Sequence, residues 1–142
     1  MMNNKFNMNE DWIKLENDEI PKGNRYAVSK FIQDDTGTRI FLDNASFAAE
    51  IIFDGIPLLV RNSSEDCVRM RTWSYAQEKY DNTFFREDFF FEIKNSSLID
   101  WLIEESYGFY EKEKIKHYCI VANDGFIDIL SAFAPKIIIS KI

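Results

Sequence analysis

Two apolar runs on either side of the pair Asp54-Gly55 constrain the fold of this chain more than any other feature. The runs are Phe47–Phe53 and Ile56–Val60. An Asp-Gly pair suits the two-residue turn of a β-hairpin, because both positions of that turn adopt positive φ. The turn would pair Phe53 with Ile56, Ile51 with Leu58 and Ala49 with Val60. We therefore predict a hairpin whose inner side carries these apolar residues into the core.

Strand-like runs recur along much of the chain. A turn at Asp34–Gly37 separates Arg25–Gln33 from Thr38–Leu42, and Asn123-Asp124-Gly125 joins a later pair of strands. The other strands are predicted at Cys67–Trp73, Phe89–Ile93, His117–Ala122, Phe126–Leu130 and Lys136–Ser140. Residues 73–88 fit either a short helix at Ser74–Tyr80 or an irregular loop.

One segment, Ser97–Tyr107, has the pattern of an amphipathic helix. Ser97 and Asp100 resemble a capping box, and Leu98, Trp101 and Leu102 form an apolar stripe. Gly108 supplies a left-handed stop. We therefore predict an α+β fold, in which an antiparallel sheet of about six or seven strands is covered by this principal helix.

The length of 142 residues fits a single domain. Residues 1–22 are rich in Asn and charged side chains and are predicted to form a partly ordered N-terminal arm, with Trp12 as its best anchor. A turn signal at Pro21-Lys22-Gly23 ends the arm. Residues 23–142 then form one α+β domain.

The sequence contains no recognisable catalytic set. It has one histidine, His117, which removes most metal sites and Ser-His-Asp schemes, and its 5 glycines match no phosphate-binding pattern. We expect no cofactor, no metal and no enzymatic activity. Cys67 and Cys119 are expected to stay reduced, and the chain begins without a leader, so we expect a cytoplasmic protein. No apolar run approaches the roughly 18 residues of a membrane span.

Charge narrows the range of partners. There are 24 acidic residues against 17 basic ones, which gives a formal net charge of -7. Such a charge repels phosphate backbones and attracts cationic surfaces. We therefore expect a protein partner and no nucleic acid; the sequence does not set the oligomeric state.

Three arginines form the one positive binding candidate. In the predicted hairpin Arg61 lies on the outer side, and alternation in the run Cys67–Trp73 places Arg69, Arg71 and Trp73 on that side too. Guanidinium groups bind carboxylate or phosphate in a bidentate manner, and an indole can stack on them. This arginine face would hold an anionic small molecule or an acidic peptide. The alternative is a solvated charge lattice with nearby carboxylates, namely Glu50, Glu65, Glu87 and Glu92.

In size, acidity, aromatic content and lack of a catalytic set, the chain resembles the small immunity proteins that bacteria keep beside polymorphic or contact-dependent toxins. The stretch His117–Leu130 also resembles small uncharacterised proteins from Gram-positive bacteria. The likeness is one of general character and transfers no functional residue. It implies a non-catalytic antitoxin whose carboxylates and aromatic anchors occlude a cationic toxin domain. The ligand-binding or regulatory module at the arginine face is the second hypothesis.

Overall fold

The computed structural model describes residues 9–15, 25–123 and 125–142. In these residues nine strands form two antiparallel sheets, which confirms the α+β class. Sheet A has five strands in the order β1 (Asp11–Lys14), β6 (Phe90–Lys94), β7 (Lys116–Val121), β8 (Phe126–Ser131) and β5 (Leu59–Ser63). Sheet B has four strands in the order β2 (Ala27–Asp34), β3 (Gly37–Asp43), β4 (Phe47–Phe53) and β9 (Lys136–Lys141). The strands are thus divided between two sheets, where we had expected one of six or seven strands.

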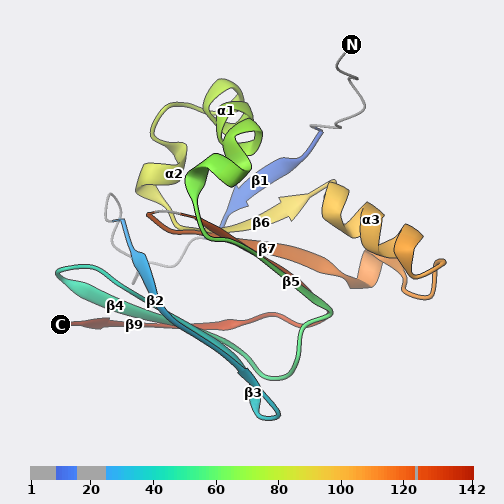
Figure 1. Cartoon of the computed structure of the whole chain (residues 1–142), viewed down its shortest axis with the longest axis horizontal. Coiled ribbons are helices and arrows are strands. Elements are labelled where there is room, and N and C mark those ends of the chain that lie inside the picture. The colour runs from blue at the N-terminus through green and yellow to red at the C-terminus, as the bar shows by residue number, and fades with distance from the viewer. Residues whose placement is uncertain (1–8, 16–24, 124) are drawn as a thin grey trace.

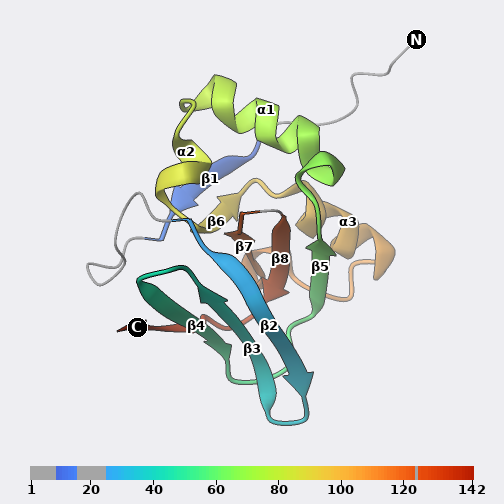
Figure 2. The same ribbon diagram turned by 60° about the vertical axis from the view of Figure 1, so that its left-hand side comes forward.

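The two sheets and the helices form three layers. Figures 1 and 2 show sheet B on one side of sheet A and the helices on the other. The helical segments are the 3-10 turns η1 (Asp66–Arg69) and η2 (Lys112–Lys114) and the helices α1 (Met70–Lys79), α2 (Phe84–Glu87) and α3 (Ser97–Glu105). Sheet A is therefore covered on both faces, which places several of its polar side chains in the protein interior.

The main core lies between the two sheets. It combines buried residues of sheet A such as Ile120 and Ile129 with buried residues of sheet B such as Ile51 and Phe53. A second cluster lies under α1 and α2 and includes Phe91 and Phe126. Strand β6 is buried on both faces, because Phe90 belongs to the first cluster and Phe91 to the second. Both faces of this strand therefore belong to the core.

The hairpin predicted at Asp54-Gly55 is wrong. Strand β4 pairs with β3 and β9, whereas β5 pairs with β8 in the other sheet. The prediction that alternate residues of β4 point inward is correct. The prediction that Ile56 joins the core is wrong, because its side chain is exposed. Pro57 explains the difference, because a proline has no N–H to donate to a neighbouring strand. The residues after Gly55 therefore form a connection between the sheets.

The strand predicted at Cys67–Trp73 is also wrong. This segment forms η1 and the first turn of α1, and Val68 and Met70, which were expected inside, are exposed. A short run with alternating apolar residues is compatible with both a strand and a helix, and here the helix buries Thr72 and Ala76, which lie one turn apart. Of the two alternatives for residues 73–88, the helix is confirmed.

The N-terminal segment contributes a strand to sheet A. In β1, Trp12 lies opposite Ile93 of β6 and is buried, as expected for the anchor of the arm. The boundary predicted at Pro21–Gly23 lies outside the described residues. Two predicted strand pairs are confirmed: Asp34 pairs with Gly37 at the end of β2 and β3, and β7 pairs with β8. Residue 124, in the turn predicted between β7 and β8, lies outside the described residues.

Helix α3 is the predicted amphipathic helix, and its capping involves a distant residue. Its N-cap is Ser96, one residue earlier than predicted, and the Ser96 hydroxyl accepts a hydrogen bond of 3.0 Å from Ile99 N–H. The carboxylate of the capping arrangement comes from Glu10, whose Oε2 accepts bonds from Ser97 N–H at 3.0 Å and Ser97 Oγ at 2.9 Å. Beyond the helix, Gly108 has φ +70°, as its predicted role as a stop requires.

Candidate functional site

Asp128 is a fully buried carboxylate at the centre of a hydrogen-bonded cluster. It lies on β8, directly opposite Arg61 of β5 and Cys119 of β7. Its Oδ2 accepts a hydrogen bond of 3.0 Å from Arg61 Nε and a second, short one from Arg69 Nη1. Its Oδ1 lies 2.7 Å from His117 Nε2. Strand pairing and the 3-10 turn η1 thus bring three charged or polar groups from separate elements to one carboxylate.

The cluster continues from His117 to the start of α3. The Ser96 hydroxyl lies 2.6 Å from His117 Nδ1. A hydroxyl oxygen can accept two hydrogen bonds and donate one, so Ser96 Oγ can bond to Nδ1 while it accepts from Ile99 N–H. At the other side of the ring, Nε2–H donates to the carboxylate of Asp128. These hydrogen bonds through Ser96, His117 and Asp128 link the N-terminus of α3 to the middle of sheet A.

The charges of the cluster stabilise the ionised form of Asp128. Burial by itself raises the pKa of this carboxyl, but the hydrogen bond and charge of His117, followed by the charges of Arg69 and Arg61, outweigh burial and hold the pKa well below its ordinary value of 3.8. Two guanidinium groups on one carboxylate leave one positive charge in excess. Burial, together with the nearby charge of Asp128, raises the pKa of the Cys119 thiol well above its ordinary value, so this thiol stays protonated.

Ser96, His117 and Asp128 are the residue types of a catalytic triad, although no catalytic set was expected from the sequence. Their connection is the reverse of that in the Ser-His-Asp triad, because Ser96 contacts Nδ1 and Asp128 contacts Nε2. The exposed fraction of Ser96 is 2%, and its oxygen is held by the cap of α3, so a substrate carbonyl has no route to it in this conformation. What this geometry does provide is a fixed connection between α3, β7 and β8.

The structure brings together two of the four residues of the predicted arginine face. Arg61 and Arg69 meet at Asp128, a residue that was not among their expected partners. Arg71 is an exposed residue of α1. Trp73 is half-buried and packs on Phe85 and Phe126. The shared face therefore does not exist as predicted, because it depended on a strand where the chain forms a helix.

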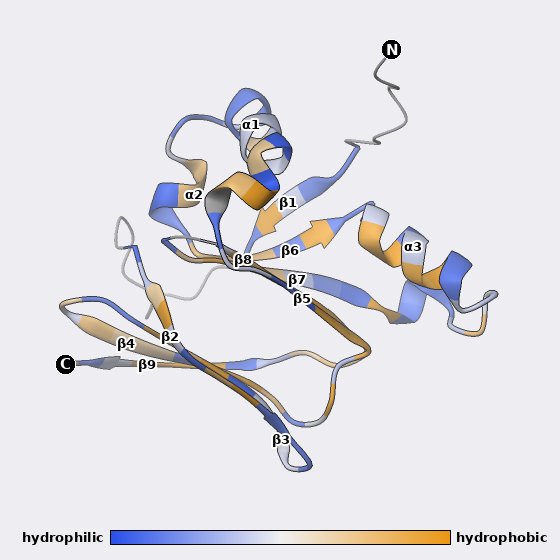
Figure 3. Cartoon of the chain, viewed as in Figure 1, coloured by the Kyte–Doolittle hydropathy of each residue, from blue (hydrophilic) through white to orange (hydrophobic). Residues whose placement is uncertain are grey.

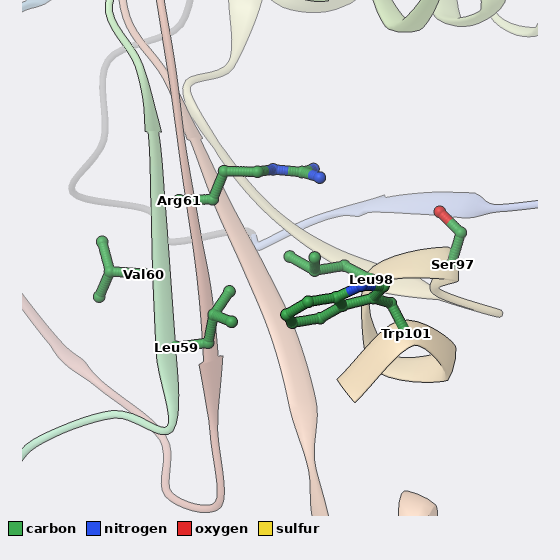
Figure 4. Close-up of a pocket in the computed structure, with 6 residues that line it drawn as sticks. All are labelled: Leu59, Val60, Arg61, Ser97, Leu98 and Trp101. Atoms are coloured by element: carbon green, nitrogen blue, oxygen red, sulfur yellow. The ribbon is translucent and has the colours of Figure 1, made fainter. Parts of the chain in front are cut away.

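Of these four residues, Arg61 also lines a cavity. A cavity of about 460 Å³ lies between β5 and α3 and is lined by Leu59, Val60, Arg61, Ser97, Leu98 and Trp101. Figure 4 shows the Arg61 side chain extending from β5 toward α3, with Leu98 and Trp101 pointing back toward β5. The side chain of Arg61 is 42% exposed, whereas that of Arg69 is 12% exposed. The excess positive charge of the cluster is therefore displayed in this groove.

A second surface lies at the other end of α3. After the helix, the loop exposes Tyr107, Phe109 and Tyr110, and four exposed carboxylates lie within three residues of these rings in sequence, namely Glu104, Glu105, Glu111 and Glu113. We call these seven residues the aromatic–acidic surface. Figure 3 shows the change along α3, where hydrophobic turns (orange) give way to a hydrophilic last turn (blue). For this region the sequence predicted only the end of a helix at Gly108.

Three searches bear on the identity of the chain. Comparison with models of protein families, with curated proteins and with solved structures finds no significant match. Within the described residues, three or more His, Cys, Asp or Glu side chains nowhere gather in a way that could hold a metal ion. Over the same residues, no helix is long and apolar enough to cross a membrane.

Part of the buried cluster could have been found from the sequence. The hairpin at residues 123–125 was predicted, and its register places His117 diagonally across from Asp128 on one face. Ser96 and Arg69 gave no such signal, because nothing local relates the start of a helix or a 3-10 turn to the middle of that hairpin. The groove depends on where α3 crosses the sheet, which is also a non-local property.

Proposed function

We propose that this protein is a non-catalytic binding protein that docks its aromatic–acidic surface on a cationic domain of another protein, in the manner of an immunity protein that occludes a toxin. The observation that carries the proposal is the exposure of aromatic rings among carboxylates. Tyr107 is 100% exposed and Phe109 is 81% exposed. Large rings are usually buried in a core unless they serve an interface, where aromatic residues supply much of the binding energy.

The charge of the same segment supports a cationic partner. Residues 100–114 carry five carboxylates and two ammonium groups, which leaves three negative charges. Both ammonium groups are already paired, Lys112 with Asp100 at 2.8 Å and Lys114 with Glu111 at 3.3 Å. Because ion pairs at the rim of an interface act mainly on the rate of association, we expect these carboxylates to steer the partner and the rings to hold it.

The backbone supports the same role for Tyr107. Its φ of +53° lies in the left-handed region, which costs a non-glycine residue about 1 kcal/mol or more. The ring is fully exposed and recovers nothing by packing in the free protein. Strained, exposed residues cluster at functional sites. A bound partner would supply the missing contacts.

The test is capture of the partner from the native host with matched baits. The baits are wild type, Phe109→Ser, the charge reversal Glu105→Lys, and two controls outside the surface, Ile138→Ser on β9 and Glu78→Lys on α1. All four substituted residues are exposed, so the variants should keep the wild-type fold, which urea unfolding checks.

We expect a basic protein that wild type and both controls retain. Titration with that purified protein should show a Kd raised about 30-fold or more by Phe109→Ser, the loss typical of a hot-spot ring. Association should slow in high salt and with Glu105→Lys. If that protein is a toxin, co-expression with wild type should restore growth and co-expression with Phe109→Ser should not. A partner bound equally well by Phe109→Ser and wild type would refute the proposal.

A further inference from the structure

The groove between β5 and α3 has the composition of a site for a small amphipathic anion. Its walls are mainly apolar, from Leu59, Leu98 and the half-exposed indole of Trp101. One charged group, the Arg61 guanidinium, enters it. Small-molecule sites are typically concave and apolar with a few fixed polar groups, and a volume of about 460 Å³ is within their usual range.

The way Arg61 is held determines what it can bind. Its Nε donates to Asp128 Oδ2 at 3.0 Å. In the described part of the chain, its terminal nitrogens Nη1 and Nη2 make no hydrogen bond, and they form the end of the guanidinium fork. That end matches the two oxygens of a carboxylate. Asp128 is buried and also bound by His117, so it fixes the orientation of the guanidinium before any ligand arrives.

The groups that line the groove favour a ligand with a single carboxylate and an apolar body. Of the described residues that line it, Arg61 alone is charged, and Arg69, the second guanidinium at Asp128, is only 12% exposed. The other polar group of the wall, Ser97, already donates its hydroxyl hydrogen to Glu10. Inorganic phosphate would leave the apolar walls uncovered, and an acidic peptide would bring several negative charges to a protein whose net charge is -7.

We propose that this groove binds a small monocarboxylate with an aliphatic or aromatic body, its carboxylate on Arg61 and its apolar body between Leu59, Leu98 and Trp101. The site requires no residue of the aromatic–acidic surface and is therefore independent of the function proposed above. It also differs from the predicted arginine face, because Trp101 takes the place of Trp73 and Arg69 acts only through Asp128.

Calorimetric titration with three probes tests the ligand class. Octanoate should bind with a Kd on the order of 0.1–1 mM, as expected for about ten heavy atoms in an open groove. Octan-1-ol, which has the same chain without the charge, should bind at least 10-fold more weakly, because a hydrogen bond to a charged group is lost. Inorganic phosphate should not compete with octanoate. Two results would overturn the proposal. One is equal affinity for octanoate and octan-1-ol. The other is no binding of octanoate at about 10 mM, which is ten times the upper end of the expected Kd range.

Variants then locate the site. Arg61→Gln should weaken octanoate binding about 10- to 100-fold, whereas Arg86→Gln, the same change at an exposed position of α2, should have no effect. Should Arg61→Gln fail to fold, Arg61→Lys keeps the charge but loses the fork and should still bind several-fold more weakly. Trp101→Ala removes a wall without touching the buried cluster and should weaken binding about 10-fold. Unchanged binding by the Trp101 variant refutes the location.

A cross-check separates this inference from the proposed function. Phe109→Ser should leave octanoate binding unchanged, and Arg61→Lys should leave capture of the protein partner unchanged. Failure of one proposal therefore does not imply failure of the other.

Discussion

Replacing Asp128 by Asn tests the view that a single carboxylate holds the interior of sheet A together. An amide has one acceptor oxygen where the carboxylate has two, so either His117 or the arginines lose their acceptor, and the amide hydrogens point at a donor. Breaking a buried ion pair by removing one partner costs about 3–5 kcal/mol, because the remaining charge is left uncompensated. That is a large part of the total stability of a domain, about 5–15 kcal/mol.

Urea unfolding measures this loss directly. With a typical slope of about 2 kcal/mol per molar urea, Asp128→Asn should lower the midpoint by about 1.5–2.5 M. The matched control is Asp54→Asn, which removes an exposed carboxylate 3.5 Å from Lys136 and should cost less than about 0.5 kcal/mol. In a double-mutant cycle with Arg61→Gln, the two changes should be non-additive by about 1–3 kcal/mol. A loss below about 1 kcal/mol for Asp128→Asn would refute the reasoning.

The stability that Asp128→Asn removes should depend on pH. The pKa of Asp128 is lowered in the folded protein relative to its ordinary value of 3.8. A group of this kind contributes its full stability above the unfolded pKa and loses it as the pH falls through the folded pKa. The stability difference between wild type and Asp128→Asn should therefore be constant above about pH 5 and shrink below about pH 4. A difference that stays constant into acid would show that the carboxylate is not the source of the effect.

Three further predictions concern single residues. Tyr107→Asn should raise the free energy of unfolding by about 0.5–1 kcal/mol, because Asn tolerates the left-handed conformation; a loss of stability would show that the ring packs in the free protein. Gly125→Ala should destabilise by about 2 kcal/mol or more in urea unfolding, because its Cβ would lie 2.1 Å from the carbonyl oxygen of Ser63; a neutral result would show that β5 can shift there. A thiol reagent should modify the exposed Cys67 rapidly and the buried Cys119 only on unfolding, and simultaneous modification of both would contradict the packing of β7.

The buried cluster and the groove share one residue. Arg61 is held by Asp128 on its Nε side and presents its other nitrogens to the groove. A binding cation is usually most effective when its own position is fixed by a second set of contacts. Asp128→Asn should thus weaken octanoate binding as well as stability, while leaving the aromatic–acidic surface intact, because that surface lies at the opposite end of α3.

Sequence pattern alone determined which way many side chains point. Alternation in Phe47–Phe53 correctly placed Ile51 and Phe53 inside, and the turns at Asp34–Gly37 and at residues 123–125 were recognised from their composition. The amphipathic stripe of α3 was equally clear. These are local properties, since the side-chain period and the turn chemistry depend on neighbours in the chain.

Tertiary structure decided which strands meet and therefore where the polar groups converge. The same alternation in β4 suits any partner strand, and only packing assigned it to β3 and β9 in place of β5. Likewise, Arg61, Arg69 and His117 come from three elements, and their shared carboxylate on β8 became apparent only when those elements were assembled. Pairing between distant segments depends on the free energy of the whole assembled core, which no local window of sequence contains.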